Sequence, residues 1–271
     1  MKTNEYYENG DALFHYTKLS AAIKFILPDK RLRFSQQKKS PDPAESNRKF
    51  LGMQGSQPSE IAGERFAEMH NTVNSPYRKL SFCSNNAPTL VLQKSQGQEE
   101  ESTDQNNCSK GWEKARMWAQ YAEDHAGICL AFSKKKLEEN LKNTLATTQY
   151  LTGYIKYYYC DKAPNVLSTN QLEDDPSGDY RAEFVEKIRF QKHIDYRDEA
   201  EFRAIVFNPE VEYIDITKSI KAVIAGFKTP KRHNKLIKKL CNSLKCEFLK
   251  VLIDPASCKF HLRLDSEIIK F

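Results

Sequence analysis

Hydrophobic and polar positions in the first third of the chain alternate between strand-like and helical patterns. Residues 12–16, 31–35 and 79–84 are short, mostly apolar runs of the kind that form strands. Over residues 19–27 apolar side chains recur every three or four positions, which predicts a helix between the first two strands. Thr17 stands just before that helix, and its hydroxyl is predicted to cap it.

The rest of the chain continues this mixture of short elements. Helices are predicted near 59–69, 112–123, 134–145, 181–190 and 229–240. Strands are predicted at 127–132, 151–159, 201–207, 211–216, 221–227, 247–253 and 259–264. Such irregular mixing favours an α+β fold, with central mixed or antiparallel sheets and flanking helices, over a doubly wound sheet.

Two polar segments interrupt the pattern, near 36–58 and 93–110. The first is punctuated by prolines, and the second is rich in Gln, Glu, Ser and Asn with almost no apolar content. Both are predicted to be insertion loops, the second of them mobile. There is no internal repeat and no clear linker, so residues 1–271 are predicted to form a single domain.

Composition narrows the class of protein. No segment approaches the roughly 20 apolar residues of a membrane span, and the polar N-terminus lacks a signal core, which predicts a cytoplasmic protein without a membrane partner. The seven Cys contain no Cys-x-x-Cys pair, so buried free thiols are expected and no metal is predicted. The net charge of +6 suits a nucleotide or nucleic-acid partner, although ordinary solubility explains it as well.

The first candidate site is His15-Tyr16-Thr17, at the junction between a predicted strand and a predicted helix. Backbone N–H groups and the helix dipole converge at such a junction, so His15 could donate a hydrogen bond to a ligand. The alternative is a core histidine followed by a plain helix cap. Asp42 and Glu45 form a second candidate, because paired carboxylates divide acid and base roles or bind a metal, although ordinary turn chemistry is the more common explanation of such a pair.

A third candidate is an aromatic stripe. Trp118 and Tyr121 are three residues apart on one predicted helix face, and His125 follows four residues later. These side chains either line a pocket or fill the core.

The fourth candidate is Glu199, Glu201 and Arg203. If a strand begins near residue 199, the three side chains share one face because strand side chains alternate. The pattern indicates a cleft for a charged ligand, with a salt-bridged solvent edge as the alternative.

Taken together, these motifs resemble bacterial domain-of-unknown-function family 2971. The resemblance rests on His15-Tyr-Thr, Asp42-Pro-Ala-Glu45, Met117-Trp-Ala-Gln-Tyr-Ala-Glu-Asp-His-Ala-Gly-Ile-Cys-Leu-Ala-Phe132 and Glu199-Ala-Glu-Phe-Arg203. It spans roughly residues 15–262. Pro41 departs from it, because the family usually has Asn there, and the polar tract before Lys110 is longer than expected.

The layout of this family is similar to the ADP-ribosyltransferase superfamily, which uses an early His, an aromatic in the middle and a late Glu. The resemblance implies an enzyme that uses NAD as substrate, by ADP-ribose transfer or NAD glycohydrolysis, in bacterial stress or phage defence. Glu201 or Glu199 would then be catalytic at the ribose, with His15 anchoring the ligand. Tyr16 or Tyr121 would stack on nicotinamide, and Arg203 or Arg33 would meet the pyrophosphate.

Two other functions fit the sequence. The first is a nucleic-acid binder or nuclease, favoured by the basic residues Lys228, Lys231, Arg232, Lys235, Lys238 and Lys239, which a solvated helix face also explains. The second is a non-catalytic ligand sensor or interaction module.

Overall fold

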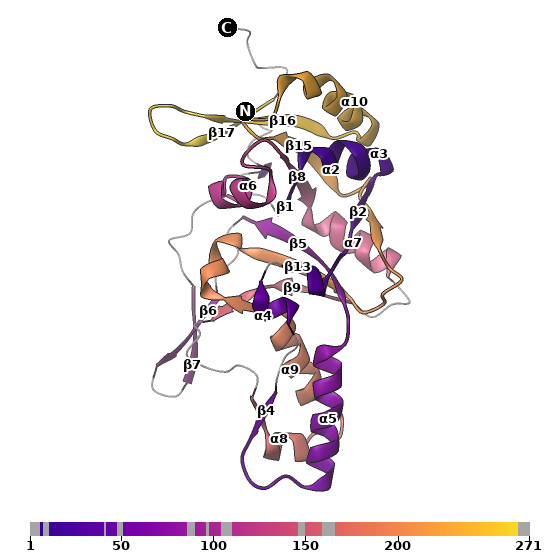
Figure 1. The fold of residues 1–271 in the computed structure, drawn as a ribbon, viewed down its shortest axis with the longest axis vertical. Coiled ribbons are helices and arrows are strands. Elements are labelled where there is room, and N and C mark those ends of the chain that lie inside the picture. Colours follow the sequence, from indigo (N-terminus) through magenta and orange to yellow (C-terminus); the bar gives the residue numbers. More distant parts are fainter. Residues whose placement is uncertain are drawn as a thin grey trace.

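The structure is a computed structural model and describes residues 6–7, 11–40, 42–47, 51–85, 90–95, 98–103, 110–145, 150–158 and 166–264. The α+β prediction is confirmed. A nine-stranded mixed sheet runs through the body of the molecule, and helices cover both of its faces (Figure 1). None of the helices in these ranges is long and apolar enough to span a membrane.

The large sheet has the strand order β17-β16-β15-β8-β1-β5-β13-β9, with β3 also paired to β5. All neighbours are antiparallel except β15 and β16. The strands are β1 (Ala12–Thr17), β3 (Ser35–Gln36), β5 (Arg78–Ser84), β8 (Ile128–Ser133), β9 (Tyr150–Tyr154), β13 (Glu201–Val206), β15 (Ile220–Ala225), β16 (Glu247–Ile253) and β17 (Phe260–Leu264).

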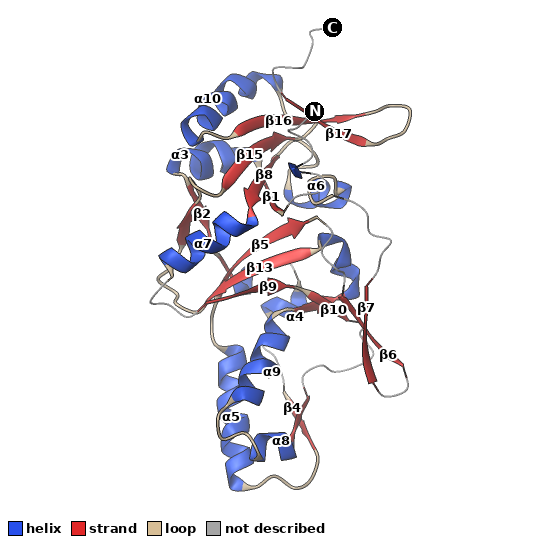
Figure 2. Ribbon diagram, turned by 180° about the vertical axis from the view of Figure 1, so that it is seen from behind, coloured by secondary structure: helices blue, strands red, loops and turns tan. Residues whose placement is uncertain are grey.

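Alternating side chains of these strands feed two separate hydrophobic cores. On one face, Leu13 and Leu130 pack with α7 (Lys134–Thr144), α10 (Asn234–Leu244) and the continuous helix of α2 (Leu19–Ala21), η1 (Ala22–Ile26) and α3 (Leu27–Asp29). On the other face, Phe14 and Cys129 pack with α6 (Ala115–Tyr121), which Figure 2 shows from behind. Central strands are therefore apolar on both sides, as their sequences require.

A lobe extends from one end of the body (Figure 1). It consists of α5 (Glu60–Asn74), α8 (Thr169–Glu173), α9 (Asp179–Arg189) and a two-stranded parallel sheet of β4 (Gly52–Gln54) and β11 (Val166–Ser168). Met69, Leu172 and Phe184 belong to its own apolar core. Segments from both halves of the sequence therefore build the lobe together.

The two polar segments are more regular than predicted. The first contains η2 (Gln37–Lys39), α4 (Pro43–Ser46) and β4. In the second, β6 (Leu90–Ser95) and β7 (Gln98–Thr103) form a hairpin, in a sheet of order β12-β10-β6-β7 with β10 (Lys156–Tyr158) and β12 (Gln191–His193). The loop prediction is wrong there, because backbone ladders form without apolar side chains when neighbouring strands are present. Within the two segments, residues 41, 48–50, 96–97 and 104–109 lie outside the described residues.

Shorter elements complete the chain, and one local prediction fails. β2 (Arg31–Arg33) pairs with β14 (Tyr213–Asp215), and η3 (Ile194–Glu199) and η4 (Lys231–His233) precede β13 and α10. Thr17 is the last residue of β1 and does not cap α2. Instead, Glu123 Oε2 accepts from the backbone N–H of Leu19 at 3.0 Å. A distant carboxylate thus replaces the local cap.

Candidate functional site

A cavity opens where two neighbouring strands of the sheet part. β1 and β5 are both described throughout, and their register contains two pairs, Leu13 with Ser84 and Phe14 with Cys83. β1 pairs with β8 along its whole length, and β5 pairs with β13 over six positions. Beyond Phe14 the register between β1 and β5 ends, while β1 stays paired with β8 and β5 with β13. The sheet therefore has a gap between β1 and β5.

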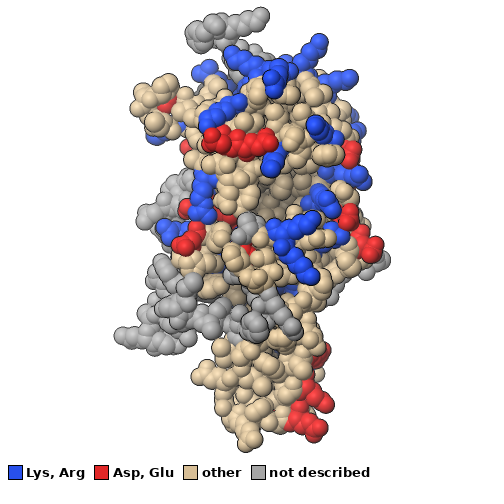
Figure 3. Space-filling view, viewed as in Figure 1, with Lys and Arg blue, Asp and Glu red and all other residues tan. Residues whose placement is uncertain are grey.

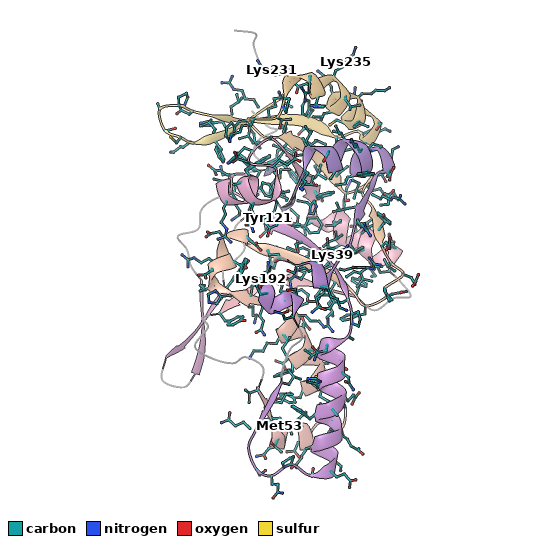
Figure 4. The ribbon with its side chains drawn as sticks, in the orientation of Figure 1. Lys39, Met53, Tyr121, Lys192, Lys231 and Lys235 are labelled. Atoms are coloured by element: carbon teal, nitrogen blue, oxygen red, sulfur yellow. The ribbon has the colours of Figure 1, made fainter. Side chains whose placement is uncertain are left out.

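The cavity has a volume of about 260 Å³. Its walls come from β1, β3, β5, β12, β13, η2, η3 and α6, elements spread over most of the sequence. Figure 4 labels three of the wall residues, Lys39, Tyr121 and Lys192, around the middle of the body. His15, Glu199 and Glu201 also line it. The early histidine and the late carboxylates, far apart in the chain, thus meet at one cavity.

Glu201 is held by two cations. Arg203 Nε donates to Glu201 Oε1 at 2.7 Å, and Arg203 Nη2 donates to Glu201 Oε2 at 3.0 Å. Lys192 Nζ lies 2.9 Å from Glu201 Oε2 and 2.6 Å from Glu199 Oε2. Bidentate guanidinium contacts of this kind are among the strongest charge-assisted hydrogen bonds. Glu201 and Glu199 therefore share one ammonium group.

Glu45 extends this set from the other side. Its carboxylate contacts Lys79 Nζ and Arg203 Nη2. With Lys192, Glu199 and Glu201 these residues form what we call the buried ion cluster, three carboxylates and three cations that are all buried. Buried charges need such compensation, because desolvation without a partner is costly.

The carboxylates of the cluster differ in protonation behaviour. Burial alone raises the pKa of Glu201, but Arg203 and Lys192 outweigh burial and hold that pKa well below its ordinary value. For Glu199, burial dominates over the attraction of Lys192, so its pKa is raised. Tyr121 Oη donates to Glu199 Oε1 at 3.1 Å. The cavity thus has one firmly ionised carboxylate beside one that takes up a proton more readily.

The alternation predicted for these acids is only partly correct. Glu201 and Arg203 belong to β13, but Glu199 ends η3. Ala200, between them, has a φ of +43°, in the left-handed region, and turns the chain. The solvent-edge interpretation is wrong, because β13 lies between β5 and β9 and all of its residues are buried.

His15 is neutral in this setting. Its Nδ1 lies 3.0 Å from the carbonyl oxygen of Ser81, and since a carbonyl only accepts, Nδ1 carries the proton. Burial lowers the pKa of His15, which favours the uncharged ring. In the neutral ring Nε2 is therefore an acceptor, so the predicted role of His15 as a donor to a ligand would require the protonated ring and stays a prediction.

Other predicted ligand residues lie beside or behind the cavity. Tyr16 borders it, yet its hydroxyl donates to the Gly111 carbonyl at 2.6 Å. Asp42, Glu45 and Arg203 are buried but do not line the wall. Glu45 and Arg203 contact the cavity-lining Lys79 and Glu201 from behind, whereas Asp42 accepts backbone hydrogen bonds at the start of α4.

Four predicted residues lie elsewhere. Thr17 is buried at the end of β1, and Trp118 is a core residue whose Nε1 donates to the Trp112 carbonyl at 2.8 Å. Arg33 is exposed, 4.0 Å from Glu212. The ring of His125 packs 4.7 Å from that of Phe227, centroid to centroid. For the aromatic stripe, the core interpretation is correct for Trp118 and the pocket interpretation for Tyr121, while the half-buried His125 belongs to neither the core nor the cavity wall.

The sequence pattern missed Lys79 and Lys192, which both line the cavity. Lys79 could have been found, because Lys79, Ser81 and Cys83 alternate with the apolar Leu80 and Phe82 in a predicted strand. Lys192 lies in the three-residue strand β12, for which the sequence has no clear signal.

The segment that carries Tyr121, Lys192 and both cavity glutamates is also the segment with a recognisable family pattern. Residues 117–204 match the family "Protein of unknown function (DUF2971)". This confirms the resemblance over that segment. No curated protein and no solved structure matches the chain. The DUF2971 segment begins in α6 and ends in β13, so it supplies one side of the cavity, while His15 and Lys79 lie outside it.

The arrangement is suited to polar chemistry on a small ligand. Among the described residues there is no group of three His, Cys, Asp or Glu that could hold a metal ion. The wall offers a neutral imidazole acceptor, an ionised carboxylate, a carboxylate with raised pKa and a phenol. These groups can bind hydroxyls, stabilise developing positive charge and accept a proton.

Proposed function

We propose that the cavity binds the nicotinamide–ribose half of NAD, and that the protein cleaves the bond between them as an ADP-ribosyltransferase-like enzyme. The observation that supports this is the meeting of His15, from the first strand, with Glu199 and Glu201 at one cavity. The cavity volume of about 260 Å³ lies just under the range of about 300–1,000 Å³ that is typical of pockets for drug-sized ligands. The cavity therefore suits the nicotinamide–ribose half of NAD better than the whole dinucleotide.

In this reaction the C–N bond between ribose and nicotinamide breaks, and its electron pair leaves with nicotinamide. The ribose gains positive charge, which the ionised Glu201 stabilises from within the cavity wall. A water or acceptor hydroxyl then attacks the ribose and loses its proton. Glu199 takes that proton, because its raised pKa makes it the better base of the pair.

The remaining roles follow from position. His15 Nε2 accepts a hydrogen bond from a ribose hydroxyl, and Tyr121 packs beside the nicotinamide. Arg203 is buried behind the wall, where it donates to Glu45, to both carboxylate oxygens of Glu201 and to the Arg189 carbonyl, so it is poorly placed to meet a pyrophosphate. Lys39 is the exposed cation on the wall, so it replaces Arg203 and Arg33 in that role.

The test is release of nicotinamide from NAD by the purified full chain, measured by chromatography, together with NAD binding by calorimetry. Glu199→Gln should retain NAD binding and lose about a hundredfold to a thousandfold in rate, the usual effect of removing one transition-state contact. Glu139→Gln, on the exposed face of α7, is the matched control and should leave the rate unchanged.

We choose Glu199 over Glu201 for the first substitution. Both carboxylate oxygens of Glu201 contact Arg203 or Lys192, so replacing Glu201 would perturb the fold. Binding without nicotinamide release would favour a ligand sensor. Absence of both NAD binding and release in the wild type would refute the proposal, and full activity of Glu199→Gln would remove that residue from the mechanism.

A further inference from the structure

Charge is distributed very unevenly along the chain. Between residues 217 and 264 there are twelve Lys and Arg against Glu247 and Asp254, a net charge of +10 in a chain whose total is +6. The rest of the protein is therefore net acidic. Figure 3 shows Lys and Arg gathered around the α10 end of the molecule, and Asp and Glu along the edge of the opposite lobe. Surfaces that merely keep a protein soluble mix both signs instead.

The helix α10 presents its lysines outward. Ile237, Cys241 and Leu244 are buried against the sheet, while Lys231, just before the helix, and Lys235 and Lys239 within it are exposed. Within the described parts of the chain, no carboxylate pairs with these three lysines. Figure 4 labels Lys231 and Lys235 at the end of the molecule away from the cavity. Their charge is therefore available to a partner.

The edge strand β17 continues the same face. Its residues His261 and Arg263 are exposed, and so is Lys259 just before the strand. Leu262, between His261 and Arg263, belongs to the opposite core together with Val251, its partner on β16. Arg263 pairs with Lys250, and Lys250 lies two positions from Phe248, which packs in the same core as α10. Because side chains alternate along a strand, His261 and Arg263 project on the α10 side of the sheet, and the exposed Lys259 comes directly before this strand.

One of the two acids in this region is directed away from that face. Glu247 is one residue before Phe248, so it projects to the other side of β16, where the Tyr7 hydroxyl donates to it. The cations along α10 and those along β17 therefore lie on one face of the sheet, and the Glu247 carboxylate lies on the other face. We name Lys231, Lys235, Lys239, Lys259 and Arg263 the α10–β17 basic surface.

We propose that the α10–β17 basic surface binds the phosphodiester backbone of a nucleic acid. Rows of cations that meet no carboxylate partner among the described residues match a regular row of phosphates, and releasing condensed counterions drives such binding. An anionic membrane is a poorer partner, because an interfacial helix must insert its apolar face, and the apolar face of α10 is already used in the core. This site is separate from the cavity and does not depend on the use of NAD.

The experiment measures binding of the full chain to a labelled DNA duplex and a labelled single-stranded RNA by fluorescence anisotropy over a range of salt concentrations. The variant Lys231→Gln/Lys235→Gln/Lys239→Gln removes three exposed charges and keeps good helix formers. Three phosphate contacts contribute about −2.7 to the slope of log affinity against log salt on duplex DNA. From about 50 to 200 mM salt, the wild type should therefore lose about fortyfold more affinity than the variant.

A matched control separates this surface from net charge. The control variant removes the same charge from exposed positions of α7 by the substitutions Lys135→Gln, Lys136→Gln and Lys142→Gln. Its nucleic-acid affinity should stay within twofold of the wild type, and its slope of log affinity against log salt should be close to that of the wild type. If both triple variants lost nucleic-acid affinity equally, net charge alone would explain the binding, and the proposal would be overturned. So would absence of nucleic-acid binding, or wild-type binding to anionic vesicles alone. NAD turnover should be unchanged in both variants, whatever the nucleic-acid result.

Discussion

Replacing Glu45 by Gln removes one charge from the buried ion cluster at nearly constant volume. In the wild type, the Glu45 carboxylate contacts both Lys79 and Arg203. The variant leaves three buried cations facing the two carboxylates of Glu199 and Glu201, with Glu45 itself 4% exposed in the wild type and so beyond the reach of bulk water. We expect a large loss of stability at neutral pH.

Two independent routes give its size. Breaking a buried pair by removing one partner costs about 3–5 kcal/mol. Burial raises the pKa of Glu45, but Arg203 and Lys79 outweigh it and lower the pKa from 4.5 to about 2. At about 1.4 kcal/mol for each pH unit, that lowering corresponds to about 3 kcal/mol of stability. Both routes predict that Glu45→Gln lowers the free energy of unfolding by about 3 kcal/mol or slightly more.

The pH dependence gives a second, sharper test. A carboxyl whose pKa is lower in the folded state stabilises the fold fully above the unfolded pKa of 4.5, and this contribution disappears as the pH falls through the folded pKa of about 2. The wild type should therefore lose stability from Glu45 on acidification, and the variant should not. At about pH 4 the difference between the two should be about 1 kcal/mol smaller than at about pH 7.

Urea denaturation, followed by Trp fluorescence at both pH values, measures these differences. Glu139→Gln, at an exposed position of α7, serves as control and should stay within about 0.5 kcal/mol of the wild type. A loss below about 1 kcal/mol in Glu45→Gln at neutral pH would show that the cluster tolerates an unpaired cation. A loss that does not shrink on acidification would show that the charge of Glu45 is not its cause.

Two further predictions concern packing and thiol reactivity. A Cβ on Gly226 would lie 2.1 Å from the carbonyl oxygen of His125, so Gly226→Ala should lower the free energy of unfolding by about 1–3 kcal/mol in urea denaturation. Gly63 lies in helix α5, and a Cβ there would meet nothing within 4 Å, so Gly63→Ala should raise the free energy of unfolding by up to about 1 kcal/mol. Burial raises the pKa of Cys129, while Cys258 is exposed, so iodoacetamide should alkylate Cys258 first. Peptide mapping by mass spectrometry should find Cys129 modified only after unfolding, and equal rates would contradict the burial.

Most of the sheet could be predicted because its strands are locally distinctive. The run around Ile128 to Phe132 is apolar on both sides, as a central strand must be, and the prediction of strands at 201–207 and 247–253 is correct to within about a residue. The loop prediction near 93–110 failed for the opposite reason. Polar strands such as β7 are held by backbone pairing, which leaves little trace in side-chain patterns.

The cavity was partly predictable in the same way. His15, Tyr121, Glu199 and Glu201 stood out as polar residues inside otherwise structured segments, and all four line the wall. His125 stood out equally, yet its φ of +69° places it in a turn after α6. Helical spacing alone could not reveal where α6 ends.

Long-range charge pairing was beyond the reach of local patterns. Glu45 and Arg203 are separated by 158 positions, and Lys79 lies 34 positions from Glu45. Nothing near Asp42-Pro-Ala-Glu45 indicates that its glutamate meets a guanidinium from a late strand. Such pairs appear only when the strand order brings β5 and β13 together.

The position of the buried ion cluster argues that it serves the cavity more than the fold. Apolar residues of similar volume in place of a buried ion network are often neutral or stabilising by about 1–4 kcal/mol, so folding alone does not call for six buried charges. Lys79, Lys192, Glu199 and Glu201 line the cavity, while Glu45 and Arg203 stand behind it. Glu45 and Arg203 hold the cavity-lining charges in place through ion pairs to Lys79 and Glu201, and the proposed NAD cleavage would use such fixed charges for electrostatic stabilisation.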